Sequence, residues 1–222
     1  MIEAVIFDLD GLILDSETPE FLAWQAIYAK YGLDLPRASW VQNIGRNDGP
    51  FDALGPFRGP NSPERPEAVV AAWRERRDAL MNQYFHPLPG VVPLLAALRA
   101  RGVRTGVASS SNMAWIRRVL TGLHLEAEFD AAAGGDEVAR AKPAPDVYLL
   151  AAGRLGVAPR ACAALEDSPN GIRAAKAAGM LCVAVPSPMT REMDFSSADV
   201  VVRSLLDVTL EMIAVADGPA EA

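Results

Sequence analysis

The chain has 222 residues, half of them apolar, so it can bury one substantial core and still have length for a second, smaller lobe. Its net charge is −7 and its basic residues are scattered, which argues against nucleic acid as a partner. No run approaches the length of a membrane span, and the apolar start carries Glu3, Asp8 and Asp10, unlike a signal peptide. Cys162 and Cys182 each lie in a short apolar run, as buried reduced thiols do, although a disulfide is the alternative. We therefore expect a soluble cytoplasmic protein with no membrane partner.

Six short apolar runs predict the strands of a parallel sheet. The first, residues 3–9 (EAVIFDL), is rich in β-branched and aromatic residues, which is typical of a strand buried on both faces. The later runs are residues 103–108, 129–133, 162–165, 181–185 and 199–202. Helix-like stretches separate most of these runs, so the sequence predicts an α/β fold with a doubly wound parallel sheet.

Three of the predicted helices have clear start or stop signals. Residues 91–101 end before Gly102, and residues 113–120 begin after Ser111 and Asn112. A third helix, residues 146–155, follows a proline and ends at a glycine, which are favoured positions for these two residue types.

Between the first strand and residue 91 the pattern changes to helical periodicity, with no convincing strand. One apolar stripe runs from Phe21 to Tyr31, and a second runs from Val69 to Tyr84. Packing within a small bundle explains most of both stripes. Residues 49–66, dense in Gly and Pro, are predicted to be a loop. We therefore expect a core domain of residues 1–14 and 88–222 and an inserted all-helical cap domain of residues 15–87.

Two carboxylates stand at the end of the first predicted strand. Asp8 and Asp10 lie where the chain leaves the sheet, and open α/β sheets bind ligands at the carboxyl ends of their strands. Carboxylates so close repel each other, and the arrangement becomes favourable when a divalent cation and a phosphoryl group share the site. A lone Asp-x-Asp pattern is common in turns, but Gly11 directly after the pair, in the run FDLDGLILDSE, favours the functional interpretation.

Three further polar groups follow later strands, and each also has an ordinary structural explanation. Residues 109–112 (SSSN) precede a helix and could bind an anion, although an N-cap explains one of them. Lys142 stands just before a helix, where a surface lysine is the default. Glu166 and Asp167 could supply oxygen ligands to magnesium, or Asp167 could cap the next helix. Because the ends of parallel strands share one edge, we expect all these groups near Asp8.

With these four segments in order, the chain resembles the haloacid dehalogenase-like (HAD) superfamily, in the branch with a helical cap inserted after the first motif. FDLDGLILDSE is similar to the first motif, VASSSN to the second, AKPAPDVY to the third and LEDSPNGIRAAKAAGM to the fourth. The resemblance spans nearly the whole chain. It implies a Rossmann-like core with an inserted cap and the activity of a phosphoric monoester hydrolase.

The resemblance also implies a role for each motif residue. Asp8 would attack phosphorus to form an aspartyl-phosphate, and Asp10 would act as general acid and then as base for the hydrolytic water. The phosphoryl oxygens would be held by Ser109, Ser110, Asn112 and Lys142. A Mg²⁺ cofactor would be bound by Asp8, the backbone carbonyl of Asp10, the side chain of Asp167 and, directly or through water, Glu166.

Two reactions remain open for a chain of this branch. Hydrolysis of a sugar phosphate or nucleoside monophosphate is the main prediction, and a β-phosphoglucomutase-type transfer is the alternative. The mutase has a histidine where this chain has Glu20. The segment NIGRND, with Gly45 and Arg46, is more similar to the cap loop of pseudouridine-phosphate and 2-deoxyglucose-phosphate phosphatases. A dehalogenase would need neither Asp10 nor the magnesium carboxylates, and a non-catalytic binding module would be expected to lack one of the motifs.

The substrate is expected to be a small phosphorylated metabolite, and the protein a monomer or a weak homodimer. The cap residues expected near the substrate are Glu17, Glu20, Trp24, Arg46 and Asn47. The histidines, His86 and His124, lie away from every motif and are assigned no catalytic role. Opening and closing of the cap, with hinges near residues 14–16 and 86–90, would admit the substrate and exclude water.

Overall fold

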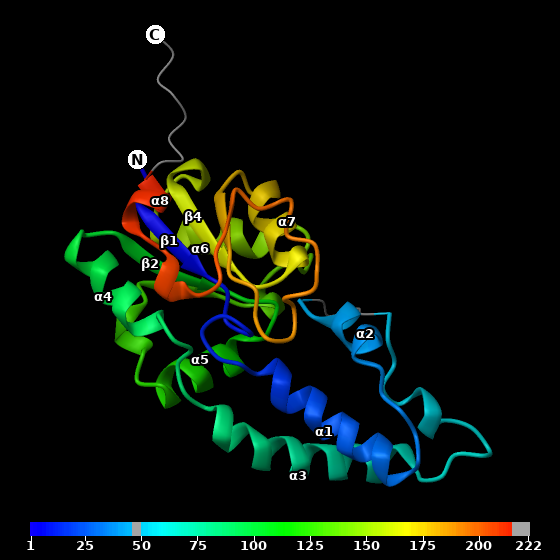
Figure 1. Cartoon of the computed structure of the whole chain (residues 1–222). Coiled ribbons are helices and arrows are strands. Elements are labelled where there is room, and N and C mark those ends of the chain that lie inside the picture. The colour runs from blue at the N-terminus through cyan, green and yellow to red at the C-terminus, as the bar shows by residue number, and fades with distance from the viewer. Residues whose placement is uncertain (46–49, 215–222) are drawn as a thin grey trace.

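The structure, a computed structural model, describes residues 1–45 and 50–214 (Figure 1). Its centre is one sheet of parallel strands in the order β3-β2-β1-β4-β5-β6. The strands are β1 (Ala4–Phe7), β2 (Arg104–Ala108), β3 (Ala131–Ala133), β4 (Cys162–Glu166), β5 (Leu181–Ala184) and β6 (Val200–Val201). The strand order reverses between β1 and β4, which is the switch point where open α/β sheets bind ligands.

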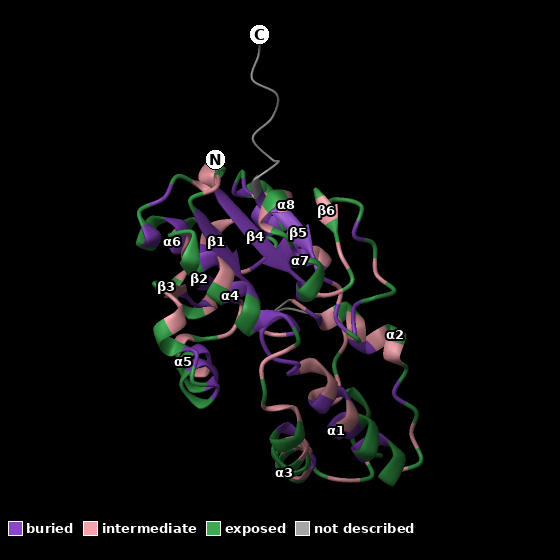
Figure 2. Ribbon diagram, turned by 60° about the vertical axis from the view of Figure 1, so that its left-hand side comes forward, coloured by how far each residue is buried: buried purple, intermediate pink, exposed green. Residues whose placement is uncertain are grey.

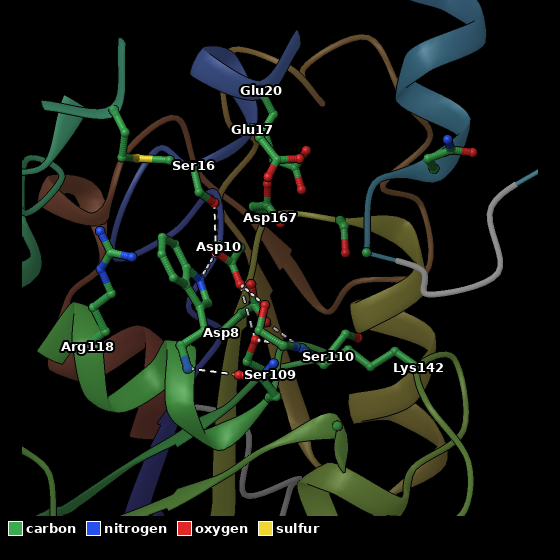
Figure 3. A pocket seen from close by; sticks show the side chains of 18 of the residues that line it. Asp8, Asp10, Ser16, Glu17, Glu20, Ser109, Ser110, Arg118, Lys142 and Asp167 are labelled. Carbon is green, nitrogen blue, oxygen red and sulfur yellow. Dashed lines mark hydrogen bonds and ion pairs between the residues drawn. The ribbon is translucent and has the colours of Figure 1, made fainter. Parts of the chain in front are cut away.

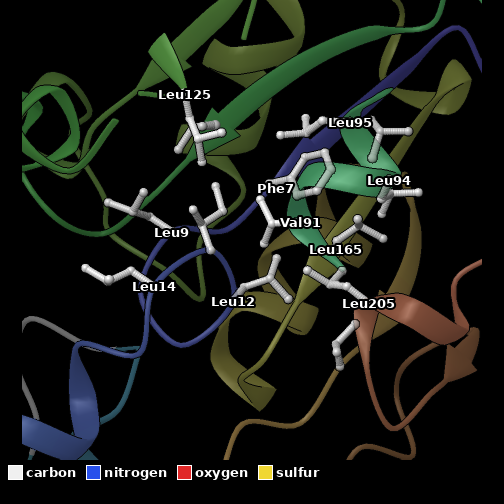
Figure 4. Close-up of a cluster of buried hydrophobic side chains, with 14 of the residues drawn as sticks. Phe7, Leu9, Leu12, Leu14, Val91, Leu94, Leu95, Leu125, Leu165 and Leu205 are labelled. Carbon is white, nitrogen blue, oxygen red and sulfur yellow. The ribbon is translucent and has the colours of Figure 1, made fainter. Parts of the chain in front are cut away.

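Helices cover both faces of this sheet. The core helices are α4 (Val91–Ala100), α5 (Met113–Gly122), α6 (Asp146–Leu155), α7 (Pro169–Ala177) and α8 (Leu210–Ala214). On one face Val5 and Phe7 of β1 pack with α4, α5 and α8, and Figure 4 shows this cluster. On the other face Ala4 and Ile6 pack with α6 and α7. Successive side chains of a strand point to opposite faces, so burial on both sides explains the unbroken apolar run of β1. The predicted doubly wound α/β fold is confirmed.

Short 3₁₀ helices lie in the described connections. They are η1 (Val41–Asn43), η2 (Gly55–Phe57), η3 (Glu126–Glu128), η4 (Gly135–Glu137), η5 (Pro159–Ala161) and η6 (Leu205–Asp207). Each of these 3₁₀ helices is three residues long, which is a usual length for 3₁₀ structure.

Each predicted strand is present, but most are shorter than the apolar run that predicted them. β1 ends before Leu9, because the carbonyl oxygen of Leu9 accepts the backbone N–H of Ile13 in a turn. β3 begins only at Ala131, and just before it the carboxylate of Asp130 accepts the backbone N–H of Thr105. Apolar character thus extends past the hydrogen-bonded ladder, since residues at strand ends can be buried without pairing.

The two cysteines are free and buried on the adjacent strands β4 and β5. Burial raises the pKa of Cys162 to about 11 and also raises the pKa of Cys182. Both thiols therefore stay protonated near neutral pH. The prediction of buried reduced thiols is confirmed, and the disulfide alternative is wrong.

The segment between β1 and α4 forms the predicted helical insertion. Its helices are α1 (Glu17–Lys30), α2 (Arg37–Trp40) and α3 (Pro66–Tyr84). Helices α1 and α3 pack along each other, and Figure 1 shows both beyond the carboxyl ends of the strands. Their shared core is aromatic, because Trp24 stacks on Trp73 with ring centroids 5.4 Å apart and Phe57 is fully buried. The predicted inserted cap is confirmed, whereas α2 was not predicted.

The insertion contacts the core near α2. The side-chain amide of Asn170 in α7 donates to the carbonyl oxygen of Ile44 at 3.1 Å. On the same side, the guanidinium of Arg37 donates to the carbonyl oxygen of Pro188. Figure 2 shows the central strands buried, whereas α1 and α3 each expose one side to solvent. The insertion therefore stands over the carboxyl edge of the sheet, anchored by contacts at α2.

Candidate active site

The carboxyl ends of three neighbouring strands bring the predicted site residues together. The last residue of β1 pairs with Val107 of β2 and with Leu165 of β4. Asp8 follows β1, Ser109 follows β2, and Glu166 is the last residue of β4. Because these strands are parallel and in register, the three side chains meet at one edge of the sheet.

Lys142 is buried at this edge, with only 3% of its surface exposed. Its ammonium donates to Asp8 Oδ1 at 2.5 Å, to Glu166 Oε1 at 2.6 Å and to the carbonyl oxygen of Ala108 at 2.9 Å. Burial would lower the pKa of Lys142, but the two carboxylates raise it above its ordinary value, so the ammonium stays charged. The structure thus brings Lys142 into contact with Asp8 and not to the surface.

Three carboxylates form a buried acidic cluster beside this ammonium. Asp8, Glu166 and Asp167 each offer an oxygen, and these oxygens lie within 4.8 Å of one another. Oδ2 of Asp167 is buried and has no hydrogen-bond partner within residues 1–45 and 50–214. Burial raises the pKa of Asp167 well above its ordinary value, and the like charges of Asp8 and Glu166 raise it further. A divalent cation that binds oxygen ligands would relieve both the repulsion and the unpaired oxygen, so these residues fit a metal ion.

Glu166 already has hydrogen bonds to both of its oxygens. Oε1 accepts from the ammonium of Lys142 and from the hydroxyl of Tyr148 at 2.8 Å. Oε2 accepts the backbone N–H of Asp167 at 3.1 Å and the hydroxyl of Ser168 at 3.2 Å. Glu166 therefore holds the ammonium and the end of β4 in place.

The carboxylate of Asp10 accepts hydrogen bonds from four side chains. Oδ1 accepts from the hydroxyl of Ser16 at 2.7 Å, drawn in Figure 3, and from the indole N–H of Trp115 at 2.9 Å. Oδ2 accepts from the hydroxyls of Ser111 at 2.7 Å and Ser109 at 3.2 Å. Sequence reasoning missed Ser16 and Trp115. The one sequence signal for Trp115 is its place in the first turn of the helix that follows the second motif.

The segment after β2 turns directly into α5. Ser109 is buried, and its Oγ accepts the backbone N–H of Ser111 at 3.0 Å. Asn112 is the N-cap of α5, since its Oδ1 accepts the backbone N–H of Trp115 at 2.8 Å. Ser110 lines the same cavity as Asp8. Asn112 lines this cavity too, and its capping bond uses only Oδ1, so Ser109, Ser110 and Asn112 all remain candidates for binding phosphoryl oxygens.

A cavity of about 580 Å³ lies between this edge and the helical insertion. Glu17 and Glu20 line it from the first turn of α1, and Figure 3 shows both pointing toward Asp167. Burial raises the pKa of Glu17 well above its ordinary value and raises that of Glu20 to about 7, although Arg77 opposes the second shift. Arg77 and Arg118 complete the outer wall. The cavity has the size and polar lining for a small, hydrophilic ligand.

Other residues of the insertion differ from expectation. Trp24, expected near the substrate, instead stacks on Trp73 inside the insertion and is only 6% exposed. The apolar helical stripe that contains Trp24 predicted this packing correctly, because an aromatic ring on that face of α1 packs against the neighbouring helix. Arg46 and Asn47 lie outside the described residues, so their contacts stay predictions.

Comparison with known proteins agrees with this geometry. A family model described as haloacid dehalogenase-like hydrolase matches residues 2–179. Hexitol phosphatase B of Escherichia coli (strain K12) is 38% identical over 212 residues, which cover 93% of this chain and 94% of that protein. Beta-phosphoglucomutase of Bacillus subtilis (strain 168) is 35% identical over 220 residues, which cover 95% and 93%. The crystal structure of CbbY from Rhodobacter sphaeroides in complex with phosphate has a TM-score of 0.75 and 31% identity, over 96% of this chain and all of that one.

The sheet order, the helical insertion and the matched family model define a hydrolase with a Rossmann-like α/β core. The chain belongs to the haloacid dehalogenase-like hydrolase family. Within that family it is a phosphatase, that is, a hydrolase of phosphoric monoesters. It belongs to the branch that acts on small metabolites. The resemblance noted in the four sequence motifs is confirmed.

Within residues 1–45 and 50–214, none of the helices combines the length and the apolar character that crossing a bilayer requires.

Proposed function

We propose that this phosphatase is magnesium-dependent and hydrolyses a sugar phosphate or a nucleoside monophosphate through an aspartyl-phosphate on Asp8. The observation that carries the proposal is the buried contact of Lys142 with Asp8, beside an acidic cluster with an unpaired oxygen on Asp167. An ammonium, a nucleophilic carboxylate and an oxygen-lined cation site are the parts that phosphoryl transfer needs.

Asp8 is the proposed nucleophile. Its carboxylate attacks phosphorus, an oxygen–phosphorus bond forms, and the bond from phosphorus to the substrate oxygen breaks. Burial raises the pKa of Asp8 above its ordinary value, and the ammonium of Lys142 opposes that rise. Lys142 therefore helps to keep Asp8 ionised and also stabilises charge on the transferring phosphoryl group.

Asp10 is the proposed general acid and base. It gives a proton to the leaving oxygen in the first step, and in the second step it takes a proton from the water that attacks the aspartyl-phosphate. That second attack breaks the bond between Asp8 and phosphorus and releases phosphate. The hydroxyls of Ser16 and Ser111 can both donate and accept, so they can follow the proton on and off Asp10.

Magnesium would be held by Asp8, by the backbone carbonyl of Asp10 and by Asp167, with Glu166 acting through water. When bound, it would neutralise charge on the phosphoryl oxygens and on these carboxylates. The phosphoryl oxygens are assigned to Ser109 and the backbone N–H of Ser110, just before α5, and to Lys142, which precedes α6. Asn112 contributes by capping α5.

The helical insertion is proposed to act as a cap. Residues 15–87 would move as a unit against residues 1–14 and 88–222, closing over the bound substrate. Glu17 would contact the leaving group, as would Arg46, which lies outside the described residues. Crystal structures of the similar CbbY contain phosphate or xylulose-(1,5)bisphosphate, and these ligands support a small phosphorylated substrate. We further propose a cytoplasmic protein that is a monomer or a weak homodimer.

The test is a phosphate-release screen over phosphorylated metabolites, with and without Mg²⁺, on the wild type and on Asp8→Asn. We expect Mg²⁺-dependent release that EDTA abolishes, and a loss of roughly 10³-fold or more in kcat for Asp8→Asn. Asp34→Asn, the same change at an exposed carboxylate, is the matched control and should keep wild-type activity.

Full activity of Asp8→Asn would overturn the proposed mechanism. Turnover of β-glucose 1-phosphate to glucose 6-phosphate, dependent on a bisphosphate activator, would instead favour the mutase reaction. Glu20, which lines the cavity where the mutase has a histidine, argues against that outcome.

A further inference from the structure

The indole of Trp115 makes a contact with the reaction machinery that none of the four sequence motifs predicts. Its N–H donates to Oδ1 of Asp10 at 2.9 Å, and its side chain lines the same cavity. We infer that Trp115 is a positioning residue, whose N–H holds the carboxyl group of Asp10 in the orientation from which it serves the leaving oxygen. This inference rests on the proposed role of Asp10 as general acid.

The chemistry of the four donors separates Trp115 from the other three. Ser16, Ser109 and Ser111 reach Asp10 through hydroxyls, which can rotate and can accept as well as donate. An indole N–H can only donate, and it sits on a rigid ring. Trp115 therefore provides the one bond of this group that keeps the same direction whether or not Asp10 carries a proton.

The indole is itself held in place from two directions. The backbone N–H of Trp115 donates to Oδ1 of Asn112 at 2.8 Å, which fixes the first turn of α5. The side chain packs against the main hydrophobic core, and the guanidinium of Arg118 lies 5.8 Å from the ring centroid. A donor fixed in this way restrains the carboxylate that it contacts. Asn112 is thus tied to the site through Trp115, apart from any contact of its own with phosphate.

The alternative is that Trp115 only fills space at the start of α5. Two substitutions separate the two roles. Trp115→Phe keeps an aromatic ring and loses the N–H, whereas Trp115→Gln loses the ring and keeps an N–H donor at comparable reach. Under the positioning role the donor matters more than the ring, and under the packing role the order is reversed.

The readout is kcat/KM on two substrates that differ in their need for an acid. The leaving group of glucose 6-phosphate is an alcohol, whose oxygen needs a proton from Asp10. The leaving group of p-nitrophenyl phosphate is a stabilised phenolate, which needs no proton. Both values report the step that transfers the phosphoryl group to Asp8. We expect Trp115→Phe to lower kcat/KM for glucose 6-phosphate by about tenfold to hundredfold, because only part of the rate contribution of the general acid is lost. For p-nitrophenyl phosphate we expect kcat/KM to fall by less than about threefold.

Three comparisons complete the experiment. Asp10→Asn should show the same substrate dependence more strongly. Trp115→Gln should restore a ratio of the two kcat/KM values closer to that of the wild type. Trp40→Phe is the matched control, because Nε1 of Trp40 is buried with no hydrogen-bond partner in the described parts of the chain, so this substitution removes no such bond. It should leave the ratio unchanged.

The outcomes are distinguishable. An equal loss on both substrates for Trp115→Phe, no loss on either, or the same ratio for the Phe and Gln variants would each show that Trp115 does not position Asp10. If Asp10→Asn itself shows no dependence on the leaving group, the proposed acid role is wrong and the inference falls with it. Thermal unfolding of each variant reports whether it is folded. If the Phe variant does not fold, the Gln variant still provides a ratio of the two kcat/KM values.

Discussion

At the scale of single residues, the site is governed by charges that are buried together. Lys142 lies between Asp8 and Glu166, both of which would be costly to bury as anions without it. With Asp167, the cluster has three carboxyl groups beside this one ammonium. A site of this kind is poised for a cation and for an anionic phosphoryl group, and it lowers the stability of the chain while they are absent.

Glu20 gives a pH-dependent test of this burial. Its pKa rises from the ordinary 4.5 to about 7, so between these values the folded chain keeps a proton that the unfolded chain releases. Stability therefore falls as the pH rises from 4.5 to 7. We expect Glu20→Gln to be more stable than the wild type at pH 8 by on the order of 2 kcal/mol, with little difference at pH 4. Urea unfolding at the two pH values, in EDTA, measures this.

Glu137→Gln is a control of opposite sign. The guanidinium of Arg154 lowers the pKa of Glu137 to about 2, so its contribution to stability is present above pH 4.5 and is lost as the pH falls toward 2. This variant should be less stable than the wild type at pH 8, and the gap should close in acid. A Glu20→Gln variant that followed the same direction would contradict the burial argument.

At the scale of elements, the site depends on how closely α7 approaches the end of β4. Gly171 lies in the first turn of α7, and a Cβ built there would overlap the carboxylate of Glu166. Gly153 in α6 is exposed, and a Cβ built there has no neighbour within 4 Å. The two glycines therefore face opposite consequences from the same substitution.

We expect Gly153→Ala to stabilise the protein by about 0.5–1 kcal/mol, since alanine is the better helix former. Gly171→Ala should destabilise it by about 1–3 kcal/mol, because Glu166 must shift and its bonds to Lys142 and Tyr148 are strained. Thermal unfolding of both variants provides the measurement. Equal and positive effects would show that the contact between α7 and β4 is not tight.

At the scale of the whole molecule, the cavity lies between the core and the helical insertion. The insertion is tied to the core through Ile44 and Arg37 near α2, whereas Glu17 and Glu20 reach over the acidic cluster from α1. Such an arrangement can admit a ligand and then close, provided that the chain bends where α1 and α3 meet the core.

We predict that the cap closes when the site is filled. Small-angle scattering should show a smaller radius of gyration with Mg²⁺ and beryllium fluoride, which mimics a phosphoryl group on an aspartate, than with Mg²⁺ alone. The same addition to Asp8→Asn should change nothing, because no acyl-phosphate mimic can form there. An unchanged radius for the wild type would show that residues 15–87 do not move as a unit.

Much of the fold could be predicted, because its signals are local. Burial of β1 on both faces leaves an unbroken apolar run, and α6 has the bounds that its proline and glycine signals predicted. The strand ends were less predictable, since Leu9 is buried although it lies in a turn and outside the ladder. The short α2 has no amphipathic pattern long enough to detect.

By itself, the sequence determined the alternation of strands and helices and the positions of the four motifs, and so also that Asp8, Lys142 and Asp167 share one edge. These follow from residue type and chain order, which need no knowledge of orientation. Only the tertiary structure decided that Trp115 and Ser16 hold Asp10 and that Trp24 stacks on Trp73 of the facing helix. Such contacts depend on the rotation and tilt of one element against another, which are fixed by packing across the whole molecule and leave no periodic trace along the chain.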